Sequence, residues 1–337
     1  MRWFDAHLDL AYLAQRGRAM DARVAEINAG RAPAGSHEPA GVTAAELDAA
    51  GVAACLATVF TEAVAAGKPL AEPQQYHAGD WAAARRAGVW QIEWYARQGL
   101  TAPRTGGVRA GVLIECADVV DGVADLAWWR ARGVVAVGLT WVGPGRYAGG
   151  NSTQAGITDQ GRALVREIDR LGIVHDASHL SEASFWQLLE LTDRRIVASH
   201  SNCRALLGGG GRGENQRHLS DDQIRQIVRR DGVIGLNLFS AFLDVRCRES
   251  GRATIDDCVR HIEHICEIAQ SRRHVGLGSD MDGGFSAARL PVGIDTPSDW
   301  PKLAHALAAR GWSDAEVAGF ASGNWERVFP SLSRIRC

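Results

Sequence analysis

Short apolar runs rich in β-branched residues alternate along the chain with longer segments in which apolar positions recur every three or four residues. The short runs predict β-strands, and the longer segments predict amphipathic α-helices. Eight strands are expected, at residues 3–9, 52–59, 108–115, 134–140, 173–178, 196–199, 233–238 and 275–279. The clearest helices are expected between them, at residues 83–98, 161–171, 220–230 and 255–269.

This alternation of strands and helices is typical of an α/β fold with a parallel sheet. Eight repeats within 337 residues predict a closed (β/α)₈ barrel, the TIM barrel. An open doubly wound sheet is the alternative, but it usually has fewer strands and a Gly-rich first turn, which is missing here. Because no linker or internal repeat is visible, residues 1–337 are expected to form a single domain. Two long loops are predicted, at residues 17–41, where a flap could form after the first strand, and at residues 207–216, which include a GGGGRG run.

Side chains of the types that bind metals follow five of the eight predicted strands. They are His7 and Asp9 at the end of the first strand, Glu115 at the end of the third, and His179, His200 and Asp280 after the fifth, sixth and eighth. A barrel brings the carboxyl ends of its strands to one rim, so we expect these groups to converge there. Any one of them could be a capping residue, but five strands that each bring such a residue to the same rim favour a metal site. Imidazole and carboxylate suit zinc or a similar divalent ion, and the number of ligands exceeds what one ion needs. Two ions are therefore expected.

Other polar residues are interpreted as structural. Asp5 shares a strand face with His7 and is expected to support the ligands. His175 lies within the fifth strand, where we expect it to face a helix or a polar network. His218 is expected at the surface, and His261 and His264 are expected to face solvent from a helix.

The sequence resembles the membrane dipeptidase (renal dipeptidase) family, which comprises zinc peptidases of the amidohydrolase superfamily. The resemblance covers nearly the whole chain, in the segments DAHLDL, LIEC, LTW, GITDQGRALVREIDRLGIVHDASHLS, IVASHSNCRAL, RHLSDDQI, GVIGLNL and HVGLGSDMDGG. It implies that one metal is bound by His7 and Asp9, a second by His179 and His200, and both by a bridging Glu115. It also implies that Arg217 holds the substrate's free carboxylate and that Asp280 is the catalytic acid/base.

Two positions depart from the family's pattern. Gly143 stands where the family has a histidine that helps to hold the substrate and its developing oxyanion. Residues 116–118 read Cys-Ala-Asp after Glu115, where the family often has Gly-x-His. Trp141, Arg146 and Tyr147 are the candidates to replace the missing histidine.

The resemblance implies a metal-dependent dipeptidase that hydrolyses the amide bond of small dipeptides, including those with a C-terminal D-residue, with a metal-bridging hydroxide and two divalent ions, expected to be Zn²⁺. One alternative is a related binuclear amidohydrolase that acts on another small carboxylate-bearing amide, such as an N-acyl amino acid or a lactam. A second alternative is a non-catalytic metal-binding barrel. Metal content and a substrate screen distinguish the three.

Composition narrows the partners to small molecules. The net charge of −2 and the absence of a basic run argue against nucleic acid. No apolar stretch approaches the ~18 residues of a membrane span, and the start of the chain lacks the apolar core of a signal peptide. The seven cysteines are scattered and form no CxxC motif, which is typical of a reducing compartment, so a cytoplasmic location is expected. The 11 tryptophans and the resemblance are compatible with a homodimer.

Overall fold

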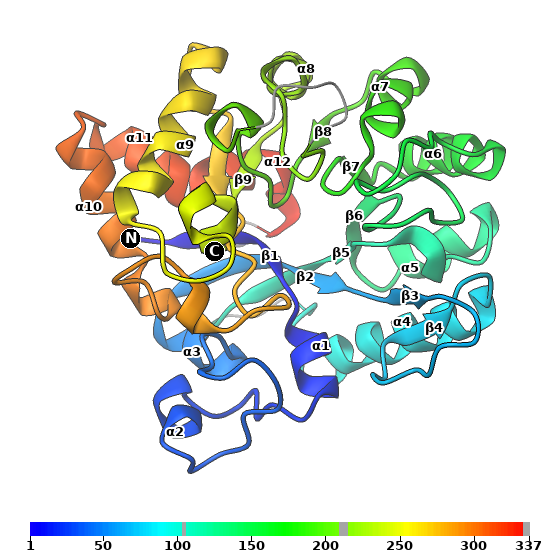
Figure 1. Ribbon diagram of the computed structural model, residues 1–337, viewed down its shortest axis with the longest axis horizontal. Helices are drawn as coiled ribbons and strands as arrows, with labels where there is room; N and C mark the ends of the chain where they lie inside the picture. Colours follow the sequence, from blue (N-terminus) through cyan, green and yellow to red (C-terminus); the bar gives the residue numbers. More distant parts are fainter. Residues whose placement is uncertain (103–105, 209–214, 333–337) are drawn as a thin grey trace.

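Eight parallel strands form one sheet in a computed structural model that describes residues 1–102, 106–208 and 215–332. The strands are hydrogen-bonded in the order β8-β7-β6-β5-β2-β1-β10-β9 (Figure 1). They are β1 Trp3–Leu8, β2 Val52–Val59, β5 Arg109–Ile114, β6 Val134–Gly138, β7 Val174–Asp176, β8 Ile196–Val197, β9 Ile234–Leu236 and β10 Val275–Leu277. Each of them lies within one of the eight predicted ranges.

The two ends of this sheet meet, so the sheet closes on itself. A parallel bridge joins Ala198, directly after β8, to Ile234 of β9. Across this seam the Gly235 amide donates to the Ala198 carbonyl at 2.8 Å, and the Ala198 amide donates to the Val233 carbonyl at 3.1 Å. A Cβ atom on Gly235 would lie 1.8 Å from the Ser199 carbonyl oxygen, so the strands can approach this closely only with glycine there. The predicted (β/α)₈ barrel is confirmed.

Helices surround the central strands (Figure 1). They are α1 Leu10–Gln15, α2 Val24–Asn28, α3 Ala44–Ala49, α4 Trp81–Arg97, α5 Leu126–Arg130, α6 Asp159–Leu171, α7 Glu182–Leu191, α8 Asp221–Arg229, α9 Ile255–Ala269, α10 Pro301–Ala309, α11 Asp314–Ala318 and α12 Asn324–Val328. Helices α6 to α9 each begin behind a Ser or Thr whose hydroxyl accepts a first-turn amide, at Thr158, Ser181, Ser220 and Thr254. These caps are local signals that the sequence carries. None of the helices in the described residues is long and apolar enough to cross a membrane.

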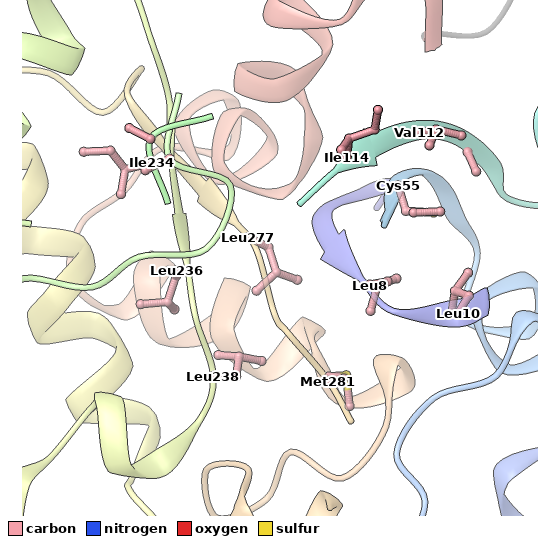
Figure 2. Packing of buried hydrophobic residues seen from close by; sticks show 14 of the residues in the cluster. Leu8, Leu10, Cys55, Val112, Ile114, Ile234, Leu236, Leu238, Leu277 and Met281 are labelled. Carbon is pink, nitrogen blue, oxygen red and sulfur yellow. The ribbon is translucent and has the colours of Figure 1, made fainter. Parts of the chain in front are cut away.

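Apolar side chains fill the space between the strands and the helices. Figure 2 shows part of this core, with Leu8, Ile114, Leu236 and Leu277 from four different strands. At the opposite end of the barrel from the strands' carboxyl termini, Phe4 of β1 packs with Trp325 of α12, with their ring centroids 6.2 Å apart. Helix α12 therefore closes the amino-terminal end of the barrel, and the polar groups gather at the other end.

The segment predicted as a flap, residues 17–41, is partly ordered into α2 and is anchored to the barrel. The buried guanidinium of Arg18 forms an ion pair with Asp282 and donates to the carbonyl oxygens of Ala34 and Val42 at 3.0 and 3.1 Å. In the other predicted loop, residues 209–214 lie outside the described residues. A small parallel sheet was not predicted; it consists of β3 Glu62–Val64 and β4 Gln75–His77.

Candidate active site

The six predicted site residues at or just beyond the carboxyl ends of the strands converge at one point on the rim of the barrel. They form three overlapping groups of possible metal ligands, each with its ligand atoms within 4.8 Å of one another: His7, Asp9 and Glu115; Glu115, His179 and His200; and His7, His200 and Asp280. All six side chains are buried. The rim predicted from the strand positions is therefore the place where they meet.

Glu115 stands between two of these groups because its two oxygens face different histidines. Oε2 lies 3.5 Å from His7 Nε2, whereas Oε1 lies 3.2 Å from His179 Nε2 and 3.7 Å from His200 Nε2. Asp9 Oδ1 completes the first group, 3.8 Å from His7 Nε2. A carboxylate placed in this way can offer one oxygen to each of two cations.

The donor set fits a divalent metal. His7 Nε2 and Glu115 Oε2 are buried and have no hydrogen-bond partner among the described residues. Nε2 of His179 and Nε2 of His200 face each other at 3.0 Å. Buried polar atoms without partners are rare in folded proteins, and a cation bound by these nitrogens and oxygens would supply the missing partner.

The charges of the groups in this metal-ligand cluster also favour bound cations. Burial raises the pKa of Asp280 to about 8, and the nearby carboxylates of Asp9 and Glu115 add to this shift, while His7 and Arg217 oppose it. Burial lowers the pKa of His7, but the attraction of Glu115, Asp9 and Asp280 outweighs burial and raises it to about 10. Three carboxylates in one buried cluster require positive charge, which bound cations provide.

The backbone is strained at the site. His179 has a φ of 67° and Asp280 a φ of 58°, in the left-handed region that non-glycine residues rarely adopt. Strain of this kind persists where the surrounding structure enforces a functional geometry. Gly283 is required as well, because a Cβ atom there would lie 2.0 Å from Asp280 Oδ1 and 2.9 Å from Asp9 Oδ2.

Beside the metal-ligand groups is a cavity of about 480 Å³. Its lining includes two aromatic pairs: Phe60 and Trp141, with their ring centroids 5.0 Å apart, and Phe239 and Phe285, which are stacked with their centroids 4.5 Å apart. In the described part of the chain, no residue of the predicted flap lines this cavity. A small molecule with apolar side chains would find aromatic partners in this cavity.

Charged and polar groups mark different parts of the lining. Arg217, a predicted site residue, lines the cavity, donates from Nη1 to Ser201 Oγ at 3.2 Å and lies 5.1 Å from the centre of the Phe242 ring. Glu62 and Gln74 also line it, and Gln74 Oε1 is buried with no hydrogen-bond partner among the described residues. The sequence analysis missed both, because Glu62 lies in the unpredicted strand β3 and Gln74 directly precedes the unpredicted strand β4.

The space beside Gly143, where the resembled family has a histidine, is not filled by neighbouring atoms. A Cβ atom on Gly143 would meet nothing within 4 Å. Of the three candidate replacements only Trp141 lines the cavity, since Tyr147 donates its hydroxyl to the Val120 carbonyl and Arg146 is paired with Asp121. Asn151 lines the cavity too, and its Oδ1 lies 3.0 Å from His179 Nδ1. No sequence signal singled out Asn151.

Asp118, in the second departure, has a structural role. It is buried and accepts hydrogen bonds from the Tyr76 hydroxyl and the Arg146 amide, both at 2.7 Å. The strand β4, which carries Tyr76, is therefore attached to the turn that follows Glu115.

Three of the other histidines can now be placed. His175 contacts Asp169 of α6 at 2.7 Å, which confirms its predicted polar network. The expectation that His218 is a surface residue was wrong, because it is buried with its ring 4.8 Å from that of Phe242. The expectation for His261 was also wrong: it is fully buried, its Nδ1 accepts from the Cys203 amide, and its Nε2 lies 3.1 Å from the Leu243 carbonyl.

His264 and Asp5 complete the set. His264 is largely covered, with 20% of its side chain exposed, and pairs with Asp221 at 2.9 Å, so the expectation that it faces solvent was largely wrong. Asp5 accepts from the amides of Ser279 and His7 at 2.8 and 3.2 Å. It thus braces the strand ends that carry His7 and Asp280.

Known proteins share this architecture. A family model described as membrane dipeptidase, peptidase family M19, matches residues 1–336. An uncharacterized dipeptidase of Schizosaccharomyces pombe is 34% identical over 186 residues, which are 55% of this chain and 42% of that protein. The chain thus spans less than half of that relative's length.

Two solved structures extend the comparison. A dipeptidase of family M19 superposes with a TM-score of 0.79 at 25% identity, covering 99% of this chain and 98% of that one. A metallopeptidase from Rhodobacter sphaeroides, liganded with a phosphinate mimic of L-Ala-D-Ala, has a TM-score of 0.78 at 23% identity, covering 98% and 99%. With a family model matched over almost its whole length, this chain belongs to the membrane dipeptidase family, a family of metallopeptidases.

Proposed function

We propose that this protein is a metal-dependent dipeptidase that binds two divalent ions, expected to be Zn²⁺, and hydrolyses the amide bond of small dipeptides. One observation carries the proposal: Glu115 turns its two oxygens toward two separate histidine groups at the edge of a cavity that also contains Arg217 and Asp280. Family membership supports the reaction type, and the donor set supports the number of ions.

Each residue would have a distinct task. His7 and Asp9 would hold one ion, His179 and His200 the other, and Glu115 both. When bound, such ions lower the pKa of water and polarise the amide carbonyl. Asn237 Nδ2 donates to Asp280 Oδ2 at 2.8 Å, which leaves Oδ1 facing the centre. Asp280 Oδ1 would take a proton from the attacking water and pass it to the leaving amine.

The two ends of the substrate would be recognised by opposite charges. The guanidinium of Arg217 can clamp a carboxylate with two parallel hydrogen bonds. The Glu62 carboxylate and the unpartnered Gln74 Oε1 offer acceptors to an ammonium group. A free dipeptide carries both charges, whereas an N-acyl amino acid or a lactam lacks the ammonium group. The lining therefore favours a free dipeptide.

We expect the purified protein to hydrolyse an apolar L,L- or L,D-dipeptide at least roughly tenfold faster, in kcat/KM, than the same dipeptide acetylated at its N-terminus, because the acetyl group removes one ion–acceptor contact. Activity should disappear with a chelator and return with Zn²⁺. The Glu62→Gln variant should lower the ratio of kcat/KM for the free dipeptide to that for the acetylated dipeptide, because it removes a carboxylate that attracts the ammonium group. A preference for the acetylated compound would favour the N-acyl amidohydrolase, and a protein that binds no metal would contradict the proposal.

We expect Arg217→Ala to raise KM for dipeptides by roughly 10- to 100-fold, because charge-assisted hydrogen bonds to the carboxylate are lost. Dipeptide amides, which lack that carboxylate, provide the control. The wild type should bind them as weakly as the variant does, and the variant should not distinguish acid from amide. If the variant still binds the dipeptide more tightly than its amide, by the same ratio of KM values as the wild type, Arg217 does not clamp the carboxylate.

Location and assembly stay predictions. The six described cysteines form no disulfide, which supports a cytoplasmic location, and Cys337 lies outside the described residues. A homodimer is supported only by the family resemblance.

A further inference from the structure

One serine lies between the two histidine groups of the centre. The side chain of Ser199, which is fully buried two residues after the end of β8, has its Oγ 2.8 Å from His200 Nδ1 and 3.3 Å from His7 Nδ1. These two rings are stacked with their centroids 3.5 Å apart, and their Nε2 atoms face the carboxylates of the centre. The same hydroxyl therefore meets the rear nitrogen of one ligand from each proposed metal site.

The hydroxyl proton of Ser199 is directed away from both histidines. Asp176 Oδ2 lies 2.5 Å from Ser199 Oγ, a distance typical of a hydroxyl that donates to a carboxylate. The other oxygen, Asp176 Oδ1, accepts from the amides of Ser178 and Ser199 at 3.0 and 2.9 Å. These two amides fix the carboxylate, which is 2% exposed, in the orientation that receives the Ser199 proton.

A hydroxyl has one proton to donate and two lone pairs to accept with. Because Ser199 Oγ donates its only proton to Asp176, it can only accept from the two imidazoles. Each imidazole must therefore carry its proton on Nδ1. A neutral imidazole protonated on Nδ1 has its lone pair on Nε2, the atom that faces the metal site. Ser178 Oγ, at 3.4 Å, competes for the second lone pair, but it already accepts from the His200 amide at 3.2 Å and its hydroxyl can rotate.

We infer that Asp176 and Ser199 form one relay that sets the tautomer of a ligand histidine in each of the two metal sites. Both are positioning residues, since neither lies among the ligand atoms. The inference rests on the proposed metal centre and adds a residue pair that tunes both sites at once. His179 is outside the relay, because its Nδ1 contacts Asn151 instead.

Asp176→Asn tests the relay without changing its shape. The two backbone amides keep the amide oxygen of the new side chain at the Oδ1 position, so its NH₂ group faces Ser199 Oγ. The Ser199 hydroxyl must then donate to Nδ1 of His7 or His200, and that neutral ring would carry its single N–H proton on Nε2, where it blocks metal binding. The result is a wrong tautomer in an intact fold, as in the trypsin Asp→Asn variant.

The measurement is the affinity for Zn²⁺ of the zinc-loaded full chain, titrated with a chromogenic chelator. We expect Asp176→Asn and Ser199→Ala to weaken zinc binding by roughly 10- to 100-fold, the usual cost of losing an outer partner of a metal ligand. Matched controls are Asp257→Asn, which alters a buried carboxylate that accepts the Thr254 hydroxyl at 2.7 Å in α9, and Ser240→Ala, which removes a fully buried serine that accepts from the Ala253 amide. Both should bind zinc like the wild type.

The outcomes separate the relay from the proposed function. A wild type that binds zinc, together with Asp176→Asn and Ser199→Ala variants that bind it equally tightly, would overturn the relay and leave the dipeptidase proposal standing. A wild type that binds no zinc would overturn both. Because Ser199→Ala could fold poorly, circular dichroism of each variant accompanies the titration, and the isosteric Asp176→Asn variant decides the question.

Discussion

Glu115→Gln is expected to remove at least one of the two bound metal ions and to abolish dipeptide hydrolysis. Glutamine keeps one oxygen and replaces the other with an NH₂ group, so only one of the two histidine groups still faces an acceptor atom. The amide is also uncharged. Zinc affinity should therefore fall by more than the roughly 10- to 100-fold that follows the loss of an outer partner. The measurement is zinc per chain by atomic emission after dialysis, together with the rate of hydrolysis.

Glu62→Gln is the matched control, because it makes the same change in the lining of the same cavity away from the ligand groups. Its zinc content should equal that of the wild type, although its choice of substrate should change. If Glu115→Gln retained two tightly bound ions and full activity, a bridging role for Glu115 would be wrong.

Asp280→Asn should lower kcat by about 10²- to 10⁴-fold, the usual contribution of a general acid or base. Asn237 Nδ2 requires an acceptor, so the new amide should place its oxygen at the Oδ2 position and its NH₂ group toward the centre. The variant then keeps the shape of the site but cannot take a proton there. KM should change little, because Asp280 acts on the reacting atoms and not on the substrate's carboxylate.

Zinc content decides how a loss of activity in this variant is interpreted. If both ions remain bound while kcat falls, Asp280 handles the proton; if an ion is lost, Asp280 is a ligand instead. Asp295→Asn, an exposed aspartate paired with Arg252, should leave kcat unchanged. Wild-type turnover by Asp280→Asn with its metal bound would exclude the acid/base role.

The fold was predictable because its signals are local. A strand such as Val52–Val59 appears as a run of buried apolar residues, and helices such as α8 start at a hydroxyl cap in Ser220. Seven of the eight strands end one or two residues earlier than predicted, because the last residues of each apolar run leave the hydrogen-bond ladder. Strand β7, for example, ends at Asp176, whereas residues 173–178 were predicted.

The errors concern polar side chains on helices and loops. His261 shares a face of α9 with the buried Cys258, Ile262 and Ile265, so the helical period did place it inward. Because histidine was treated as a polar residue, this buried face was not recognised. In the structure, both ring nitrogens of His261 have backbone partners in the interior. The position of His218 was also misjudged, because it follows residues 207–216, which were predicted as a loop and whose path the sequence does not specify.

By itself the sequence determined the barrel and the rim on which its His, Asp and Glu residues would meet, since strand periodicity is local and a closed parallel sheet sends every strand's carboxyl end to the same side. Only the tertiary structure decided which oxygen of Glu115 faces which histidine, how Glu62 and Asn151 reach the cavity, and that Ser199 lies between two imidazoles. These relations join residues from different strands and loops. They depend on packing over distances that no sequence pattern encodes.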